Sequence, residues 1–205
     1  MIHNKTESNR GYSFVEMLIV LAIMAIMSAM AIVTWNSVNS ARYRNAVSTF
    51  ESEISTLRTA TQAQGSEMAL KVYYDINYKD RFNKPIGAYV IKRGYCDDSG
   101  TFHEINLADT STVPSEYSHL LNSDYYTYRG VSNPVFVMQK GKIKYASTGT
   151  AIATDIGASG VIIRYNKSDG SVKNGDGKFV IEKANGDIAA TVNIVKVTGT
   201  YFETY

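Results

Sequence analysis

The strongest constraint in this sequence is an apolar run near its beginning. Residues 17–33 carry no charged side chain, and the next charged residue after Glu16 is Arg42. At about 1.5 Å of rise per residue, a helix formed by the uncharged residues 17–41 can cross the roughly 30 Å hydrocarbon core of a bilayer. The polar segment before it contains Lys5 and Arg10, and a basic flank favours a cytoplasmic location for that end. The remainder of the chain is therefore expected on the outer side, attached to an apolar helix.

Two common kinds of segment share this pattern. One is a secretory signal peptide, for which Ala29-Met30-Ala31 offers a small-residue cleavage site, and the other is an uncleaved anchor. The run is longer than the usual core of a signal peptide. It also carries Glu16 in its first turns, where an ionised group in hydrocarbon is costly and usually functional. The helical pattern, moreover, continues to Gln64, so both explanations are disfavoured.

From Val38 onward the helical pattern becomes one-sided. Apolar residues recur at alternating spacings of four and three: Tyr43, Val47, Phe50, Ile54 and Leu57. This spacing places them on one helix face. Charged residues are expected on the rest of the helix: Arg42, Arg44, Glu51, Glu53 and Arg58. The stripe is too short for a coiled coil with another chain, so we expect it to pack against the chain's own globular domain.

After Gly65 the pattern changes to that of strands and turns. Runs of β-branched and aromatic residues, bounded by turn formers, predict strands at 68–74, 86–92, 101–107, 134–139, 143–146, 160–165, 179–182 and 188–198. Asn185-Gly186-Asp187 is the strongest hairpin signal, and Lys140-Gly141 is expected to join strands 134–139 and 143–146. Residues 108–130 are interpreted as a variable insertion. These features predict an antiparallel sheet that packs on the amphipathic helix.

The segment Gly11-Tyr12-Ser13-Phe14-Val15-Glu16-Met17-Leu18-Ile19-Val20 resembles the cleavage and methylation signature of type IV prepilins and pseudopilins. The resemblance implies that a prepilin peptidase cleaves after Gly11 and that the new terminal residue, Tyr12, is N-methylated. Most members carry phenylalanine in place of Tyr12. In this family the residue matching Glu16 is needed for assembly, because its carboxylate pairs with the terminal amine of a neighbouring subunit in apolar surroundings.

A second resemblance involves the end of the helix and the end of the chain. Ser55 to Gly65, with Arg58 and a small turn before a strand, is similar to the GspH/FimT group of minor pseudopilins and minor pilins. The strand pattern around Asp169-Gly170 and Val197-Thr198-Gly199 is similar to that group as well. Many pilins carry a helix-bending proline where this chain has Val33, and minor subunits often lack it. These features favour a minor subunit.

The resemblances imply an α+β, pilin-like fold, in which a long N-terminal helix packs against an antiparallel β-sheet head. The expected parts are a leader peptide at 1–11, a transmembrane and filament-core helix at 12–36, an amphipathic helix at 37–64 and a head at 65–205. The expected function is a minor pilin or pseudopilin of a type IV pilus-like filament or a type II secretion pseudopilus. The expected partners are prepilin peptidase, other pilin subunits and the membrane, and the protein then moves to the filament surface outside the cell. The alternative is a filament-tip subunit that binds DNA or a surface.

Composition gives little support for nucleic-acid binding. The formal net charge is only +2, and a DNA-binding surface needs a cluster of lysine and arginine. Lys140, Lys142 and Lys144 alternate along a predicted edge strand, where lysines commonly block aggregation. We therefore expect no nucleic-acid partner.

No residue pattern indicates a catalytic or metal site. Cys96, His103 and His119 do not share a ligand-like spacing, and acidic neighbours in the expected turn around Cys96 disfavour a reactive thiolate. Some pseudopilins bind calcium, and residues 169–177 offer oxygen donors. Lys173, however, lies among these donors, and no glutamate closes a ligand set of the EF-hand kind. We expect no enzyme activity, no cofactor and no metal.

Overall fold

The computed structural model describes residues 13–65, 67–105, 111, 113–122 and 135–204, with the backbone alone at 31–39 and 122. It divides into a first unit, residues 1–42, and a second unit, residues 43–205, which we call the head. The expected leader and Tyr12 lie outside the described residues, as does most of the expected insertion at 108–130. Within that insertion, Ser115–Asn122 forms a 3-10 helix, η2.

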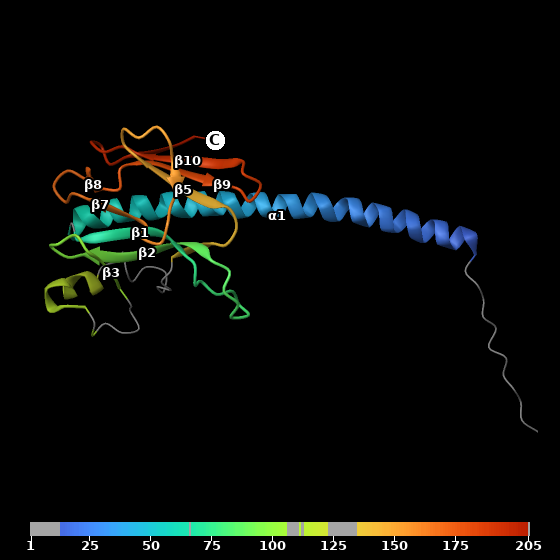
Figure 1. Cartoon of the computed structure of the whole chain (residues 1–205), viewed down its shortest axis with the longest axis horizontal. Helices are drawn as coiled ribbons and strands as arrows, with labels where there is room; N and C mark the ends of the chain where they lie inside the picture. The colour runs from blue at the N-terminus through green and yellow to red at the C-terminus, as the bar shows by residue number, and fades with distance from the viewer. Residues whose placement is uncertain (1–12, 66, 106–110, 112, 123–134, 205) are drawn as a thin grey trace, which may run out of the picture. The chain divides into compact units, whose positions relative to one another are not determined.

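Helix α1 spans Phe14–Ala63 and is 50 residues long (Figure 1). It contains neither proline nor glycine, the two residues that most readily interrupt a helix. It begins after Ser13, whose carbonyl oxygen accepts the amides of Glu16 at 2.9 Å and Met17 at 3.1 Å. At the other end, Gly65 N donates to Thr61 O at 3.1 Å before the chain turns. The expected segments 12–36 and 37–64 therefore share one continuous helix.

The first sheet of the head is antiparallel and holds six strands. They are β1 Met68–Asp75, β2 Ala88–Cys96, β3 Phe102–Glu104, β4 Phe136–Met138, β7 Val161–Tyr165 and β8 Val172–Asn174. Their order is β3-β2-β1-β7-β8, and β4 also pairs with β2. The long strand β1 lies at the centre, where it pairs with β2 over its whole length and with β7 from Ala69 to Val72.

The second sheet holds five strands in the order β11-β10-β9-β5-β6. They are β5 Lys142–Ser147, β6 Thr154–Asp155, β9 Gly177–Glu182, β10 Ile188–Ile194 and β11 Tyr201–Thr204. The predicted Asn185-Gly186-Asp187 turn joins β9 to β10, and Gly186 has a φ of 91° there. The sequence predicted one sheet, whereas the structure has two.

The predicted hairpin across Lys140-Gly141 is wrong. Strand β4 pairs with β2, with Val137 opposite Val90, whereas β5 pairs with β9, with Ile143 opposite Ile181. Gly141, with a φ of 93°, lies where the chain passes from the first sheet to the second. Strands β4 and β5 thus belong to different sheets.

The predicted turn around Cys96 is also wrong at that residue. Cys96 is the last residue of β2 and is buried. Its amide donates to Glu67 O at 2.8 Å, and Cys96 lies opposite Phe102 of β3. The acidic turn begins only at Asp97, whose carbonyl accepts Gly100 N at 2.9 Å. Because β2 pairs with other strands on both sides, it continues beyond the predicted strand, 86–92.

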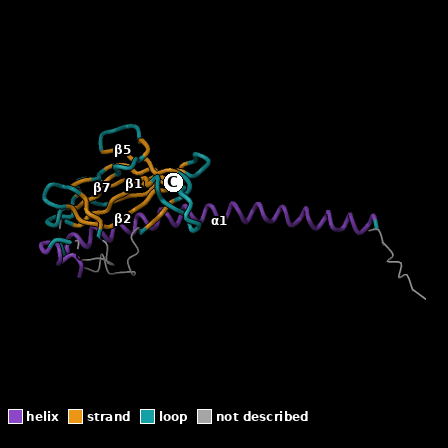
Figure 2. Tube along the Cα trace, turned by 60° about the horizontal axis from the view of Figure 1, so that its bottom comes forward, coloured by secondary structure: helices purple, strands orange, loops and turns teal. Residues whose placement is uncertain are grey.

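The core of the head forms where the helix face meets both sheets. Phe50 and Phe179 of β9 make an edge-to-face contact with ring centroids 5.1 Å apart. The same cluster contains fully buried side chains from the first sheet, among them Met68, Leu70 and Ile163. Figure 2 shows the strands gathered along this part of the helix. One stripe of the helix thus supplies apolar contacts to two sheets.

Candidate assembly site

The first turn of α1 carries a carboxylate, Glu16, which follows Tyr12 by four residues in the sequence. Glu16 lies in that turn, and its side chain is exposed among apolar neighbours. A negative charge is favourable at this end of a helix because the free backbone amides give it a partial positive charge. Gly11 and Tyr12, the predicted cleavage and methylation residues, lie outside the described residues.

The first part of α1, on both sides of Glu16, is apolar on every side. Its large apolar side chains are exposed by 44% to 78%: Phe14, Val15, Met17, Leu18, Ile19, Val20, Leu21, Ile23, Met24, Ile26, Met27 and Met30. A helix that is apolar all round is normally surrounded by protein or lipid, so this surface indicates an assembly or membrane environment. Among the residues whose side chains are described, no helix is long and apolar enough to cross a membrane.

The structure places the predicted helix-to-head stripe as follows. Val47, Phe50, Ile54 and Leu57 are between 0% and 4% exposed and belong to the core of the head. Tyr43, the first residue of the head, is half-buried, and its hydroxyl oxygen accepts the amide of Ala184 at 2.9 Å. The stripe therefore lies wholly against the head.

Sequence reasoning missed a buried ion pair on the flank of this stripe. Arg93 donates from Nε to Glu53 Oε2 at 2.7 Å and from Nη2 to Glu53 Oε1 at 2.8 Å. The side chains are 5% and 2% exposed, so the expectation that Glu53 lies on the outer surface is wrong. Glu53 lies three residues after Phe50 and four before Leu57, on the apolar face. This position on the apolar face is the sequence signal that could have indicated a buried carboxylate.

Arg58 connects the last part of α1 to two turns of the head. Its Nε donates to Gly170 O at 3.2 Å, and its Nη2 donates to Thr198 O at 2.7 Å. The two turns are tightly packed, because a Cβ on Gly199 would lie 1.8 Å from Gly170 O. The structure thus brings together the helix end, Asp169-Gly170 and Val197-Thr198-Gly199.

The residues considered for catalysis or metal binding have local partners. His103 Nε2 lies 2.8 Å from Asp97 Oδ2, and His119 Nδ1 lies 3.0 Å from Glu116 O. Burial raises the pKa of the Cys96 thiol, which disfavours the thiolate. The carboxylate of Asp169 accepts the amide and hydroxyl of Ser171. Within the described residues, no three His, Cys, Asp or Glu side chains are grouped as metal ligands.

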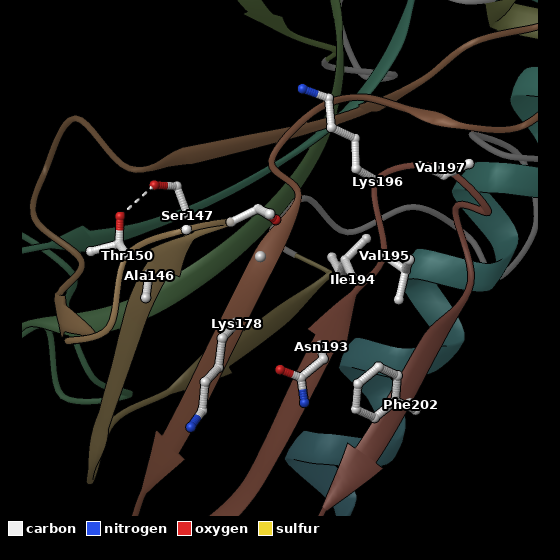
Figure 3. Close-up of a pocket in the computed structure, with 13 residues that line it drawn as sticks. Ala146, Ser147, Thr150, Lys178, Asn193, Ile194, Val195, Lys196, Val197 and Phe202 are labelled. Atoms are coloured by element: carbon white, nitrogen blue, oxygen red, sulfur yellow. Dashed lines mark hydrogen bonds between the residues drawn. The ribbon is translucent and has the colours of Figure 1, made fainter.

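A cavity of about 410 Å³ opens on the second sheet, between the β5–β6 and β10–β11 connections. Lys178, Lys196, Asn193 and Phe202 contribute to its lining, and Ser147 and Thr150 make a hydrogen bond across one wall at 3.0 Å (Figure 3). Among the described residues that line it, none is His, Cys, Asp or Glu. The described lining of the cavity thus includes two lysines and a phenylalanine but no acid–base pair.

Comparison with known proteins identifies one match, at the beginning of the chain. Residues 8–32 match the family model of the prokaryotic N-terminal methylation motif. No curated protein and no solved structure matches the chain. The matched residues include Gly11, Tyr12 and Glu16, together with the apolar surface of α1. The motif supports the type IV pilin and pseudopilin family and indicates a type IV pilin-like precursor that is processed by prepilin peptidase.

Proposed function

We propose that this protein is a minor pilin or pseudopilin, a structural subunit that assembles through α1 into a type IV pilus-like filament or a type II secretion pseudopilus. One observation carries the proposal. The methylation motif at 8–32 leads directly into a 50-residue helix, which places Glu16 in its first turn. The far part of the same helix forms the core of an α+β head. A filament subunit needs this combination of a processed apolar helix and a folded head.

In this proposal, prepilin peptidase cuts between Gly11 and Tyr12, and the new amine of Tyr12 is methylated. The mature chain would then begin close to the first residue of α1, Phe14. A neighbouring subunit presents its terminal amine to the carboxylate of Glu16. Each charge is costly in apolar surroundings without a partner, so the pair favours subunits that are correctly placed along the filament.

The minor-subunit assignment is supported by the head and by the helix. Arg58 joins the helix end to the two turns at Gly170 and Thr198, and these segments are similar to the GspH/FimT group. The chain has no proline before Pro85, so the bend common in major pilins has no sequence basis here. We infer a structural rather than an enzymatic role, first at the cell membrane and then on the surface of a filament.

A second candidate function is a filament-tip subunit that captures DNA or adheres to a surface. The cavity lined by Lys178, Lys196 and Phe202 favours it. Lys142 and Lys144, in contrast, form ion pairs with Asp155 and Glu182, so they add little to a DNA-binding surface. A DNA mobility shift that weakens with salt and with Lys178→Gln would support this function. The absence of any shift at low salt would remove its DNA-binding form.

The leading proposal is tested by processing and incorporation. The protein is co-expressed with a prepilin peptidase and its filament genes, and its intact mass is measured in membranes and in sheared filaments. In the parent protein we expect the loss of residues 1–11 and the gain of one methyl group. In Gly11→Val we expect neither change. Gly157→Val is the matched control, because a Cβ at Gly157 meets no atom within 4 Å. Unchanged mass and incorporation in Gly11→Val would overturn the proposal.

A further inference from the structure

The connection between β1 and β2, residues 76–87, is a well-formed projection that we call the 76–87 loop. Lys79 and Pro85 form a β-bridge across it. Asp80 N donates to Lys84 O at 2.9 Å, and Asn83 N donates to Asp80 O at 3.0 Å, with Asn83 at a φ of 62°. These bonds close a tight turn around Phe82, so the loop holds its tip in a defined shape.

The tip of the loop presents an aromatic ring to solvent. Phe82 is 74% exposed, and Ile76 and Ile86 are 68% and 38% exposed. The Phe82 ring is therefore held at the tip of an ordered turn, where it is available for a contact outside the head. The packing of the head does not explain these side chains.

Three basic side chains lie on the same loop as this ring. Lys79, Arg81 and Lys84 are exposed, and the guanidinium carbon of Arg81 lies 4.7 Å from the centroid of the Phe82 ring. The only carboxylate within the 76–87 loop, that of Asp80, accepts the amides of Phe82 at 2.8 Å and Lys84 at 3.0 Å. The surface around Phe82 is therefore cationic.

The base of the loop is connected through packed residues to Tyr43, the first residue of the head. A Cβ on Gly141 would lie 3.1 Å from the Tyr43 ring, and the next residue, Lys142, together with Ile143, interacts with Tyr89. Tyr89 follows Ala88, which pairs with Asp75 at the base of the loop. The loop and the start of the head thus share one end.

We propose that the 76–87 loop docks on an anionic phospholipid surface, with Phe82 in the interfacial region and Lys79, Arg81 and Lys84 on the lipid phosphates. The proposal rests on the proposed function, because the N-terminal segment supplies the anchor that holds the head near lipid. Basic side chains are attracted to an anionic surface, and a tethered second contact gains from a high effective concentration. Docking would hold the unassembled subunit with the base of its head on the membrane.

Charge and geometry favour lipid over a protein partner. A protein groove that accepts Phe82 would also need to supply acids to the three basic groups of the loop. A phospholipid surface supplies an apolar layer beneath a continuous layer of phosphates, and basic side chains extend readily from one to the other. A neighbouring subunit as the occupant is left as an outcome of the test.

The test uses the full-length protein in nanodiscs that contain either phosphatidylglycerol or phosphatidylcholine. A fluorophore is attached to Asn77→Cys, since Asn77 is exposed and the native Cys96 is buried. Quenching by doxyl-labelled lipids reports contact between the loop and the bilayer. We expect at least a threefold stronger quenching in phosphatidylglycerol, and a loss of this difference at high salt. A label at Ser168→Cys, in the β7–β8 turn, should show no such difference.

Matched variants separate the charge from the ring. Changing Lys79, Arg81 and Lys84 together to Gln should reduce loop docking at least about tenfold, since three charges are removed. Changing Lys167, Lys173 and Lys178 to Gln removes the same charge elsewhere and should change nothing. Phe82→Ser should weaken quenching in both lipids, whereas Ile152→Ser, at a residue that is 76% exposed, should not.

Three outcomes would overturn the proposal. They are equal quenching in the two lipids, quenching unaffected by the loop variants, and quenching that depends on the number of subunits per nanodisc, which would indicate a neighbouring chain. Failure of the proposed function is distinguishable, because incorporation into nanodiscs reports on the anchor alone. A protein that enters nanodiscs but shows no lipid-dependent quenching refutes only the docking of the loop.

Discussion

Arg93 of β2 holds Glu53 of α1 in a buried, two-pronged ion pair, with N–O distances of 2.7 and 2.8 Å. Two parallel hydrogen bonds fix the rotation of the helix about its own axis and its position along β2. Apolar contacts alone would tolerate a small slide of the helix, whereas this pair does not. The pair therefore specifies how the helix is seated in the head.

Glu53→Ala should strongly destabilise the head, because it removes the carboxylate that balances the buried charge of the Arg93 guanidinium. Breaking one side of such a pair costs roughly 3–5 kcal/mol. The free energy of unfolding, measured by chemical denaturation in detergent, checks this value. The double variant Glu53→Leu with Arg93→Met should recover much of the loss.

The matched control for this change is Glu104→Ala. Glu104 pairs with Lys92 at 2.6 Å, but both groups are partly exposed. An exposed pair contributes only about 0–1 kcal/mol. Equal losses in Glu53→Ala and Glu104→Ala would contradict the role assigned to the buried pair.

Glu16→Gln should leave cleavage after Gly11 intact and reduce filament incorporation by about tenfold or more, on the order of the 1.4 kcal/mol that corresponds to a factor of ten. The amide keeps the shape of the side chain but cannot neutralise a terminal amine. Immunoblots of sheared filaments and of membranes measure the two steps separately. Glu116→Gln, at an exposed carboxylate of η2, is the control. Normal incorporation of Glu16→Gln would exclude the ion pair as the basis of assembly.

Arg58→Lys should loosen the turns at 166–170 and 195–199. Lysine keeps the charge, but it cannot donate to Gly170 O and Thr198 O together in the flat geometry of a guanidinium. Losing these bonds costs about 1–3 kcal/mol. Hydrogen exchange should accelerate in both turns and in β11, while β1 and β2 stay protected. Lys173→Arg, an exposed change on β8, should alter neither region.

Glu51 makes stability depend on pH. Burial raises the pKa of its carboxyl above 4.5, and the negative charge of Glu203 raises it further. The ionised form is therefore disfavoured in the folded head. The stabilising contribution of the neutral form is complete below the unfolded pKa and is lost as the pH rises through the folded pKa.

Glu51→Gln removes this dependence. The melting temperature of the variant should equal that of the parent near about pH 4 and exceed it near about pH 7. Thermal unfolding followed by circular dichroism at both pH values gives the comparison. Glu116→Gln should show no pH-dependent difference. A gain from Glu51→Gln that is the same at both pH values would refute the assignment.

Local periodicity made the helix and the strongest hairpin predictable. The spacing of Val47, Phe50, Ile54 and Leu57 is enough to indicate one face of a helix. Asn185-Gly186 likewise indicates a β-hairpin turn without information from distant residues. The methylation signature is likewise local. The predicted roles of Gly11, Tyr12 and Glu16 remain predictions, because they depend on a peptidase and on a second subunit.

Pairing between distant segments was not predictable in the same way. Strand β4 joins β2 rather than the adjacent β5, and nothing in Lys140-Gly141 distinguishes a hairpin from a passage between sheets. The short strands β6, β8 and β11 have two to four residues, too few for an alternating pattern. The partner of Glu53 lies forty residues away on β2. Contacts between residues so far apart in the sequence are decided by the packing of the core and not by local residue patterns.

The continuity of α1 has a mechanical consequence. In a filament under tension, force reaches the head along the helix backbone, because Arg42 and Tyr43 are consecutive residues of one helix. Pulling the helix out of the head would have to break two sets of contacts at once, because both are loaded in the same direction. These are the buried face from Val47 to Leu57 and the Glu53–Arg93 pair. Resistance to pulling is set by the rate of unfolding rather than by equilibrium stability. A head seated in this way would transmit load to its sheets before it released the helix.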